Sequence, residues 1–202
     1  MARGDYERWE ARYASRDSSE LASVDPFLQE LEPELPTSGR ALDVAGGTGR
    51  HAICLARRGL EVTLTDVSPR GLEIASAVGA QQGVCLTTIA CDLDDEDLPS
   101  GPFDFIWCSW FLVSGALWKK MEGVLAPGGW IAYVQPTVEN LERHARPSAR
   151  FLAEPKVLER EIRNAGLVVS RSEVGWDVNE NHTLRLIVRR GSGGGATGVP
   201  LL

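Results

Sequence analysis

The stretch RALDVAGGTGRH, residues 40–51, decides the fold of this 202-residue chain. An apolar run reaches an acid, Asp43, and a glycine-rich turn then leads into residues that predict the start of a helix. Glycine permits positive φ and lets a ligand come close to the backbone. A helix N-terminus presents free N–H groups to the same crevice. A turn of this kind binds a nucleotide-like ligand at the carboxyl ends of a parallel sheet.

Strands and helices alternate after this turn. The predicted strands cover residues 40–44, 62–66, 84–90, 103–108, 130–134, 167–174 and 183–188. Successive βα units imply a parallel sheet with right-handed crossovers, and the last two strands read as a hairpin. The sequence therefore predicts an α/β, Rossmann-like doubly wound sheet of about seven strands, mostly parallel with one antiparallel strand from the C-terminal hairpin, and with helices on both faces.

Three regions follow from the pattern. Residues 1–36 predict an N-terminal helical lid, in which Tyr6, Trp9 and Tyr13 share one helix face. That aromatic face either packs on the body of the protein or faces a bound ligand. Residues 37–190 form the ligand-binding domain, and residues 191–202 predict a flexible tail because of their glycine and serine content.

Composition excludes several classes of function. A net charge of −7 disfavours a nucleic-acid partner. No apolar run approaches the length of a membrane helix, and the charged N-terminus lacks a signal-peptide core. The cysteines lie singly, without metal-ligand spacing, which predicts buried thiols in a reducing, cytoplasmic setting and no metal site. They are Cys54, Cys85, Cys91 and Cys108.

Acids at three strand ends bear on the identity of the ligand. Asp66 ends the second strand, where a carboxylate can accept both ribose hydroxyls. Residues 47–52 formally satisfy the dinucleotide pattern G-x-G-x-x-G/A, so a nicotinamide enzyme stays open. Asp43, however, would repel a pyrophosphate at the turn, and Asp92 after the third strand can accept a bond from an adenine amino group. Any one such acid is often only a helix cap, but three in succession favour a ligand site.

This layout, with LAPGG at residues 125–129 before the fifth strand, resembles the class I S-adenosylmethionine-dependent methyltransferases over residues 26–189. WEARY at 9–13, PFL at 26–28 and FLAEP at 151–155 are similar to the small-molecule branch that includes tellurite-resistance and thiopurine-type methyltransferases. One position departs from the pattern. Ala45 stands where the family usually has the first glycine of its turn, which points to weakened binding.

The resemblance implies S-adenosyl-L-methionine as the cofactor and makes residues 37–190 the methyltransferase domain. The residues that it assigns to the cofactor are Arg12, Asp43, Ala45, Gly46, Gly47, Gly49, Asp66, Val67, Asp92, Leu93, Cys108 and Ser109. The turn residues shape the pocket for the methionine part, and Arg12 pairs with its carboxylate. Asp66 accepts hydrogen bonds from the ribose hydroxyls, and Asp92 with Leu93 contacts the edge of the adenine.

The acceptor pocket is assigned to Trp9, Tyr13 and Trp110. The expected reaction is methyl transfer to a small-molecule acceptor, at O, N, S or a similar atom, by in-line displacement. Two alternatives remain: a non-catalytic module that binds the cofactor or a partner, and a nicotinamide-dependent oxidoreductase. No catalytic residue is assigned, although Glu139, His144 and Glu154 belong to segments that could cover the site.

Two reactive side chains near the turn receive structural interpretations instead. Cys108 is expected to be a packed small residue, because no basic neighbour in the sequence would lower the pKa of its thiol. His51, just after the turn, is expected to be a surface or packing residue and not a catalytic one.

Overall fold

A computed structural model describes residues 3–15 and 22–191 of the chain. Its helices are α1 (Arg3–Ala14), α2 (Pro26–Glu30), α3 (Arg50–Arg57), α4 (Pro69–Gln81), α5 (Gly115–Val124) and α6 (Pro155–Asn164), with the 3-10 helices η1 (Val138–Glu142) and η2 (Ala149–Phe151). Its strands are β1 (Arg40–Val44), β2 (Glu61–Asp66), β3 (Thr87–Ala90), β4 (Phe103–Ser109), β5 (Leu125–Pro136), β6 (Leu167–Trp176) and β7 (His182–Arg190). The predicted tail lies outside the described residues, apart from Gly191.

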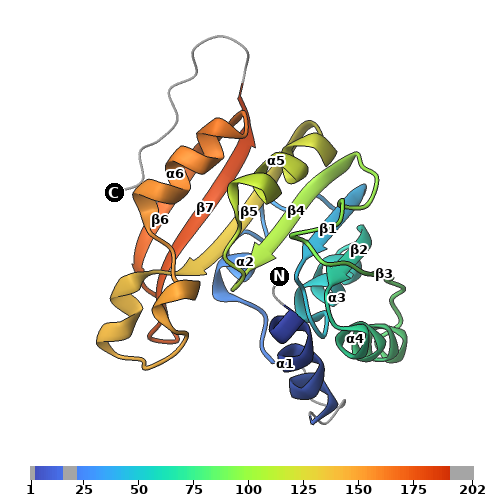
Figure 1. Cartoon of the computed structure of the whole chain (residues 1–202). Helices are drawn as coiled ribbons and strands as arrows, with labels where there is room; N and C mark the ends of the chain where they lie inside the picture. The colour runs from blue at the N-terminus through green and yellow to red at the C-terminus, as the bar shows by residue number, and fades with distance from the viewer. Residues whose placement is uncertain (1–2, 16–21, 192–202) are drawn as a thin grey trace.

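The seven strands form one sheet in the order β3-β2-β1-β4-β5-β7-β6 (Figure 1). The pairs from β3 to β5 are parallel, and β7 runs antiparallel to both of its neighbours. The predicted sheet, with its single reversed strand, is confirmed. Strand order changes direction between β1 and β4, and in such sheets a ligand binds beyond the carboxyl ends of the strands at this switch point.

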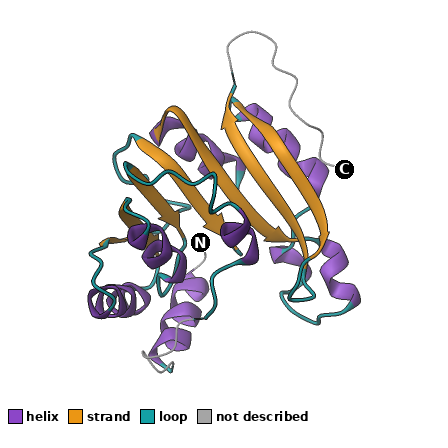
Figure 2. Cartoon of the chain, turned by 180° about the vertical axis from the view of Figure 1, so that it is seen from behind, coloured by secondary structure: helices purple, strands orange, loops and turns teal. Residues whose placement is uncertain are grey.

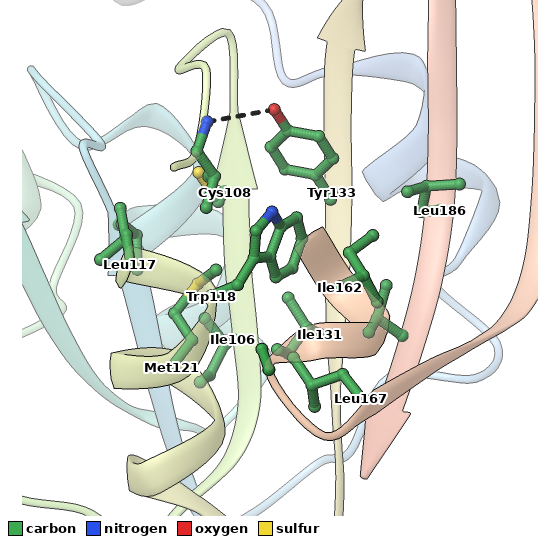
Figure 3. Packing of buried hydrophobic residues seen from close by; sticks show 14 of the residues in the cluster. Ile106, Cys108, Leu117, Trp118, Met121, Ile131, Tyr133, Ile162, Leu167 and Leu186 are labelled. Atoms are coloured by element: carbon green, nitrogen blue, oxygen red, sulfur yellow. Dashed lines mark hydrogen bonds between the residues drawn. The ribbon is translucent and has the colours of Figure 1, made fainter. Parts of the chain in front are cut away.

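Helices cover both faces of the sheet (Figure 2). One core joins the sheet to α5 and α6, and Trp118 at its centre lies edge-on to Tyr133 with ring centroids 5.2 Å apart (Figure 3). The other core joins the opposite face to α2, α3 and α4. Tyr133 and its neighbour Val134 enter different cores, because successive side chains of a strand point to opposite faces.

One strand boundary differs from the prediction for a physical reason. The strand predicted at residues 130–134 begins at Leu125, directly after α5 ends at Val124. Leu125 already pairs with Phe103, and the register then shifts so that Phe105 pairs with Trp130. The intervening Pro-Gly-Gly turn is thus absorbed as an irregularity within one long strand.

The other differences lie at the start and the edge of the sheet. Helix α2 ends at Glu30, and Leu31 and Leu35 beyond it stay buried. Strand β3 covers only residues 87–90 and lies at the sheet edge, so Cys85 before it is exposed. The expectation of buried thiols is therefore wrong for Cys85. Among the described residues no helix is long and apolar enough to cross a membrane.

Candidate cofactor and acceptor site

The glycine turn lies at the carboxyl end of β1, as the sequence predicts. It is closed by hydrogen bonds from Gly46 N to Thr65 O at 3.1 Å and from Gly49 N to Gly46 O at 3.0 Å. Ala45, Gly47 and Gly49 all have positive φ, at 55°, 59° and 79°. Glycine adopts this region without strain, whereas alanine does so at a cost of roughly 1 kcal/mol. The replacement at residue 45 therefore keeps the shape of the turn but strains it.

Asp43 lies directly beneath this turn and is fully buried. Its Oδ2 accepts a hydrogen bond from Ala52 N at 3.0 Å, whereas Oδ1 is buried without a partner among the described residues. Burial, opposed by that hydrogen bond and by Arg50, raises the pKa of the carboxyl to about 8. Such an unpartnered buried oxygen indicates a place for a ligand donor or a water molecule.

Asp66, at the end of β2, fixes the turn from the neighbouring strand. Its Oδ2 accepts from Gly47 N at 2.8 Å and its Oδ1 from Ser68 N at 2.9 Å. Burial raises its pKa, and these hydrogen bonds oppose the rise. The acid thus makes cap-like contacts, as the structural interpretation expects. Each oxygen retains a second lone pair, with which it could also accept a ribose hydroxyl.

The third acid, Asp92, follows β3 beside Asp66. Cys91 N donates to Asp66 O at 3.0 Å, so the chain leaves β3 next to the end of β2. Asp92 is half-buried and accepts a hydrogen bond from Asp94 N at 3.2 Å, and Leu93 beside it is buried. Since β1, β2 and β3 are adjacent and parallel, the three acids lie next to one another at the carboxyl ends of these strands. The half-buried Val67 leaves β2 at the same edge.

The N-terminal helix α1 packs against the turn. Tyr13 is buried, and a Cβ atom added to Gly47 would lie 2.4 Å from its hydroxyl oxygen. Trp9 stacks on Tyr13 with ring centroids 5.6 Å apart. These contacts favour the packing interpretation of the aromatic face. Arg12, expected to bind the cofactor carboxylate, is exposed and has its guanidinium 4.8 Å from the Trp9 ring centroid.

Sequence reasoning missed Glu10, which attaches α1 to α4. Its carboxylate accepts a short hydrogen bond from Ser68 Oγ and a second one from Arg70 N at 3.3 Å. At the other side of α1, the Arg8 guanidinium lies 5.0 Å from the Phe151 ring in η2. Helix α1 therefore reaches from the start of α4 to the segment between β5 and α6. No sequence spacing signals a contact across so many residues.

The mouth of β4 holds the next expected residues. Cys108 is fully buried, and burial raises its pKa well above the usual value, so its interpretation as a packed residue is confirmed. Ser109 is half-buried and accepts a hydrogen bond from Trp107 Nε1 at 3.2 Å. Trp110 is 40% exposed and has a φ of 58°, a left-handed conformation that is rare for a bulky side chain.

His51 is buried, not on the surface, and packs 5.1 Å from the ring centroid of Trp107. The packing half of its interpretation is therefore correct. Its Nε2 accepts from Asp25 N, and Asp25 in turn contacts Trp110. The sequence did not single out Asp25 as a site residue, because its cap-and-proline pattern fully accounted for it.

The three suggested bases contact other parts of the chain. Thr137 Oγ1 bonds the Glu139 carboxylate and lies 2.7 Å from His182 Nδ1, and His144 Nε2 lies 2.7 Å from Glu180 O. Glu139 and His144 thus lie by the turn between β6 and β7 and not by the glycine turn. Glu154 is exposed at the start of α6. The described residues contain no group of three or more His, Cys, Asp or Glu side chains arranged to hold a metal ion.

Comparison with known proteins places this sequence among methyltransferase relatives. Residues 41–129 match the family described as "Methyltransferase domain". The chain is 44% identical over 54 residues to the putative methyltransferase YqeM of Bacillus subtilis, covering 27% of this chain and 22% of that protein. It is 26% identical over 121 residues to the ubiquinone biosynthesis O-methyltransferase of Bordetella avium, covering 56% and 50%. The chain thus spans half or less of the length of these curated relatives.

The fold has solved counterparts. A TehB-like S-adenosylmethionine-dependent methyltransferase from Corynebacterium glutamicum superposes with a TM-score of 0.67 at 16% identity, covering 93% of this chain and 98% of that one. The expected resemblance is therefore confirmed: the chain has the fold of the class I S-adenosylmethionine-dependent methyltransferases, including the TehB-like branch, and its residues 41–129 match a methyltransferase domain. S-adenosylmethionine is the cofactor that this family implies.

Proposed function

We propose that this chain, with the fold and domain of a class I methyltransferase, transfers a methyl group from S-adenosylmethionine to a small-molecule acceptor at O, N, S or a similar atom. The observation that carries this proposal is the buried, unpartnered Oδ1 of Asp43 beneath the glycine turn. A ligand with an ammonium group and hydroxyls suits a site built from this acid and two further strand-end carboxylates.

The residues that would hold the cofactor lie at the carboxyl ends of β1, β2 and β3. Asp43 would receive the ammonium directly or through water, Asp66 the ribose hydroxyls, and Asp92 the adenine amino group. The backbone of Gly46, Gly47 and Gly49 would shape the pocket for the methionine part, with strained Ala45 weakening the fit. When bound, the cofactor supplies a methyl group that its sulfonium charge has already activated.

The remaining work of the protein is alignment and exclusion of water, which can account for much of a rate enhancement. Residues 3–14 would act as the lid, because α1 already contacts both α4 and η2. The exposed Trp110 indole at the mouth of β4 would stabilise a nearby cation by about 1 kcal/mol. Since Cys108 is fully buried with a raised pKa, a covalent step through its thiol is not proposed.

A small acceptor is supported by the segments around the site and by charge. The Arg8 guanidinium of α1 lies 5.0 Å from the Phe151 ring of η2, so these two segments meet near the proposed site. The net charge of −7 argues against a nucleic-acid acceptor. One matched relative is an O-methyltransferase by name. The four cysteines are all free, which supports a reducing compartment such as the cytoplasm.

A second candidate is a module that binds the cofactor without turnover. The left-handed Ala45 favours it, because strain in the turn weakens a site that must hold the cofactor firmly.

Release of S-adenosylhomocysteine separates the two candidates. The purified chain is incubated with S-adenosylmethionine and a panel of phenols, thiols, amines and oxyanions, and the product is quantified by mass spectrometry. Acceptor-dependent product that disappears in Asp66→Ala supports the proposal. Cofactor binding without product from any acceptor supports the non-catalytic module, and equal product from Asp66→Ala contradicts the assigned site.

A further inference from the structure

Trp110 combines strain with exposure. It follows β4 directly, and its φ of 58° is held in place by a hydrogen bond from its N–H to Val134 O at 2.9 Å. In β4, Cys108 pairs with Val44, so Trp110 leaves the sheet beside the glycine turn. A bulky residue keeps a left-handed backbone only when its surroundings enforce it, and such strain concentrates at functional sites. The indole nevertheless remains 40% exposed.

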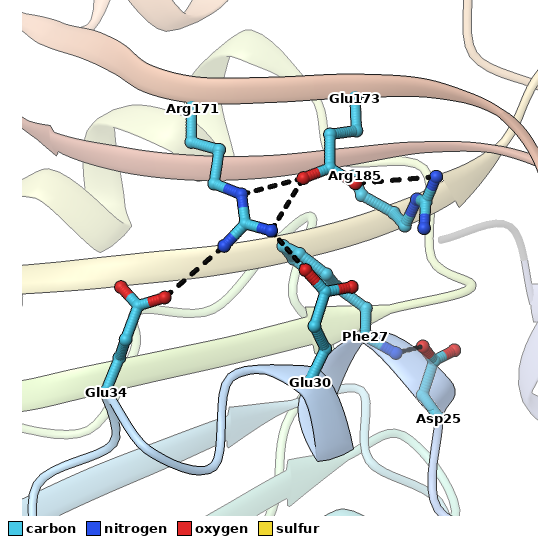
Figure 4. Close-up of polar contacts among 7 residues, drawn as sticks. All are labelled: Asp25, Phe27, Glu30, Glu34, Arg171, Glu173 and Arg185. Atoms are coloured by element: carbon cyan, nitrogen blue, oxygen red, sulfur yellow. Dashed lines mark hydrogen bonds and ion pairs between the residues drawn. The ribbon is translucent and has the colours of Figure 1, made fainter.

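The side chain of Trp110 interacts with the carboxylate of Asp25, a residue 85 positions earlier in the chain. Asp25 is buried at the start of α2, where its Oδ1 caps the helix by accepting from Phe27 N at 3.0 Å (Figure 4). A carboxylate has room for a second acceptor contact, and a bond from an indole N–H to an ionised oxygen is stronger than a neutral one. Asp25 thus performs two tasks, of which only the cap is explained by local structure.

The position of Asp25 is fixed by residues that directly follow the glycine turn. Its N–H donates to His51 Nε2 at 3.2 Å, and Arg50 Nε donates to the same nitrogen at 3.2 Å. A nitrogen that accepts two such bonds carries no proton, and burial together with Arg50 lowers the pKa of His51 well below its usual value. His51 and Arg50 open α3 immediately after the glycine turn. A continuous set of contacts therefore connects that turn to Trp110 through His51 and Asp25.

We propose, on the basis of the methyl-transfer function above, that Asp25 is a positioning residue that holds the Trp110 indole as one wall of the acceptor pocket and thereby selects acceptors with a planar aromatic face. A fixed, solvent-facing indole offers a flat apolar surface, on which an aromatic ring stacks more favourably than its buried area alone provides. His51 supports the same wall from beneath by fixing the backbone of Asp25.

The first measurement uses 2-naphthol as a planar probe, titrated by calorimetry into protein saturated with S-adenosylhomocysteine. Wild type is expected to bind the probe. Asp25→Asn retains an oxygen for the helix cap but turns an amide N–H₂ toward the indole, and Trp110→Phe retains a ring but removes the N–H donor. Each is expected to lower the affinity for 2-naphthol about fivefold.

The double variant tests whether the two residues act through each other. Because Asp25→Asn and Trp110→Phe remove the same interaction between these two side chains, the double variant is expected to bind 2-naphthol as Trp110→Phe alone does. A purely structural role of Asp25 would instead give independent effects whose fold-changes multiply. Multiplying effects, or an Asp25→Asn variant that binds like wild type, would overturn the proposal.

Ser114→Ala is the matched control for loss of a helix cap. Ser114 Oγ accepts from Leu117 N at 3.3 Å at the start of α5, a helix that packs on the other face of the sheet. Its removal is expected to lower the melting temperature without changing the affinity for 2-naphthol. Equal losses of probe affinity in Ser114→Ala and Asp25→Asn would reduce the role of Asp25 to that of a cap and contradict the proposal.

The dependence on pH gives a second readout. Burial raises the pKa of Asp25 and nearby Asp177 adds to the rise, whereas Phe27 N, the indole and Arg50 oppose it. Acidification is therefore expected to weaken 2-naphthol binding in wild type and in Asp177→Asn but not in Asp25→Asn, since neutral His51 and charged Arg50 keep their states. A loss on acidification that persists unchanged in Asp25→Asn would contradict the assignment.

The saturating ligand separates the possible failures. If wild type does not bind S-adenosylhomocysteine, the proposed function is contradicted and the aromatic pocket falls with it. If wild type binds S-adenosylhomocysteine but not 2-naphthol, the proposed function stands and the selection of planar acceptors is overturned.

Discussion

The two halves of the sheet are built on different principles. In the half from β1 to β3, the candidate ligand acids lie at or next to the ends of their strands and accept hydrogen bonds from the backbone that follows those strands, as Asp43 does from Ala52 and Asp66 from Ser68. In the half from β5 to β7, polar side chains meet from distant parts of the chain. Arg171 on β6 binds Glu30 and Glu34 from the α2 region and Glu173 from its own strand (Figure 4).

This difference distinguishes the cofactor site, which members of a family share, from the acceptor site, which differs between members. A strand that ends in an acid before a turn reproduces the cofactor site locally, whatever the rest of the chain does. The acceptor side depends on contacts such as those between Asp25 and His51, which only the assembled fold brings together. The variants below test whether the halves are in fact separable, in decreasing order of expected effect.

Asp66→Ala should have the largest effect and should confine it to cofactor binding. The change removes the ribose acceptor and also leaves Gly47 N and Ser68 N without their acceptors. We expect S-adenosylmethionine affinity to fall about 100-fold, close to 3 kcal/mol, in calorimetric titrations. Glu61→Ala, at the exposed start of the same strand, should bind like wild type. Equal losses in both variants would show that the effect is general destabilisation.

Asp43→Asn should change how stability depends on pH. The folded-state pKa of Asp43, about 8, lies above its ordinary value of 3.8. Between these values the native state holds a proton that the unfolded chain has lost, so wild-type stability falls as the pH rises. We expect Asp43→Asn to gain about 2 kcal/mol over wild type from about pH 6 to about pH 8, measured by urea unfolding without cofactor. Parallel profiles for the two proteins would contradict the buried-acid assignment.

Gly47→Ala should affect the site more than a glycine of similar backbone conformation elsewhere. Both Gly47 and Gly128 have positive φ, at 59° and 81°, but a Cβ would meet the Tyr13 hydroxyl only at Gly47. Each replacement should cost about 1 kcal/mol in strain, and only Gly47→Ala should also lower cofactor affinity. Removing the hydroxyl with Tyr13→Phe in the Gly47→Ala background should restore part of that affinity. No restoration would mean that α1 does not lie on the turn in solution.

Arg171→Met should have the smallest effect and should leave the cofactor site untouched. The guanidinium is 32% exposed, so its ion pairs with Glu30, Glu34 and Glu173 are screened by solvent. We expect about 1 kcal/mol of lost stability, reduced further by salt, and unchanged cofactor affinity. A lower cofactor affinity in Arg171→Met would show that the two halves are coupled.

The sequence predicted the parts of the molecule that local chemistry determines. Ser68 caps α4 ahead of Pro69, and Gly59 after α3 has a left-handed φ of 108°, as glycine at the end of a helix commonly does. Asp66 lies where the strand pattern predicts. The early start of β5 was missed because it depends on Leu125 pairing with a strand 22 residues before it.

The unpredicted site residues share one physical property. Glu10 reaches Ser68 across 58 positions, and His51 accepts from Asp25 across 26. Each of these residues also has an ordinary local explanation, as a helix surface acid, a packing histidine or a cap. Periodicity and spacing report neighbours within a few residues, so contacts that close between elements leave no sign in one sequence.

The most direct measurement is a calorimetric titration of the wild-type chain with S-adenosylmethionine and, separately, with reduced nicotinamide adenine dinucleotide. Binding of the first in the micromolar range, with none of the second, is the predicted result. Failure to bind S-adenosylmethionine, or binding of the nicotinamide cofactor in its place, would mean that Asp43, Asp66 and Asp92 serve only as structural caps, and would contradict the assignment of a methyltransferase site.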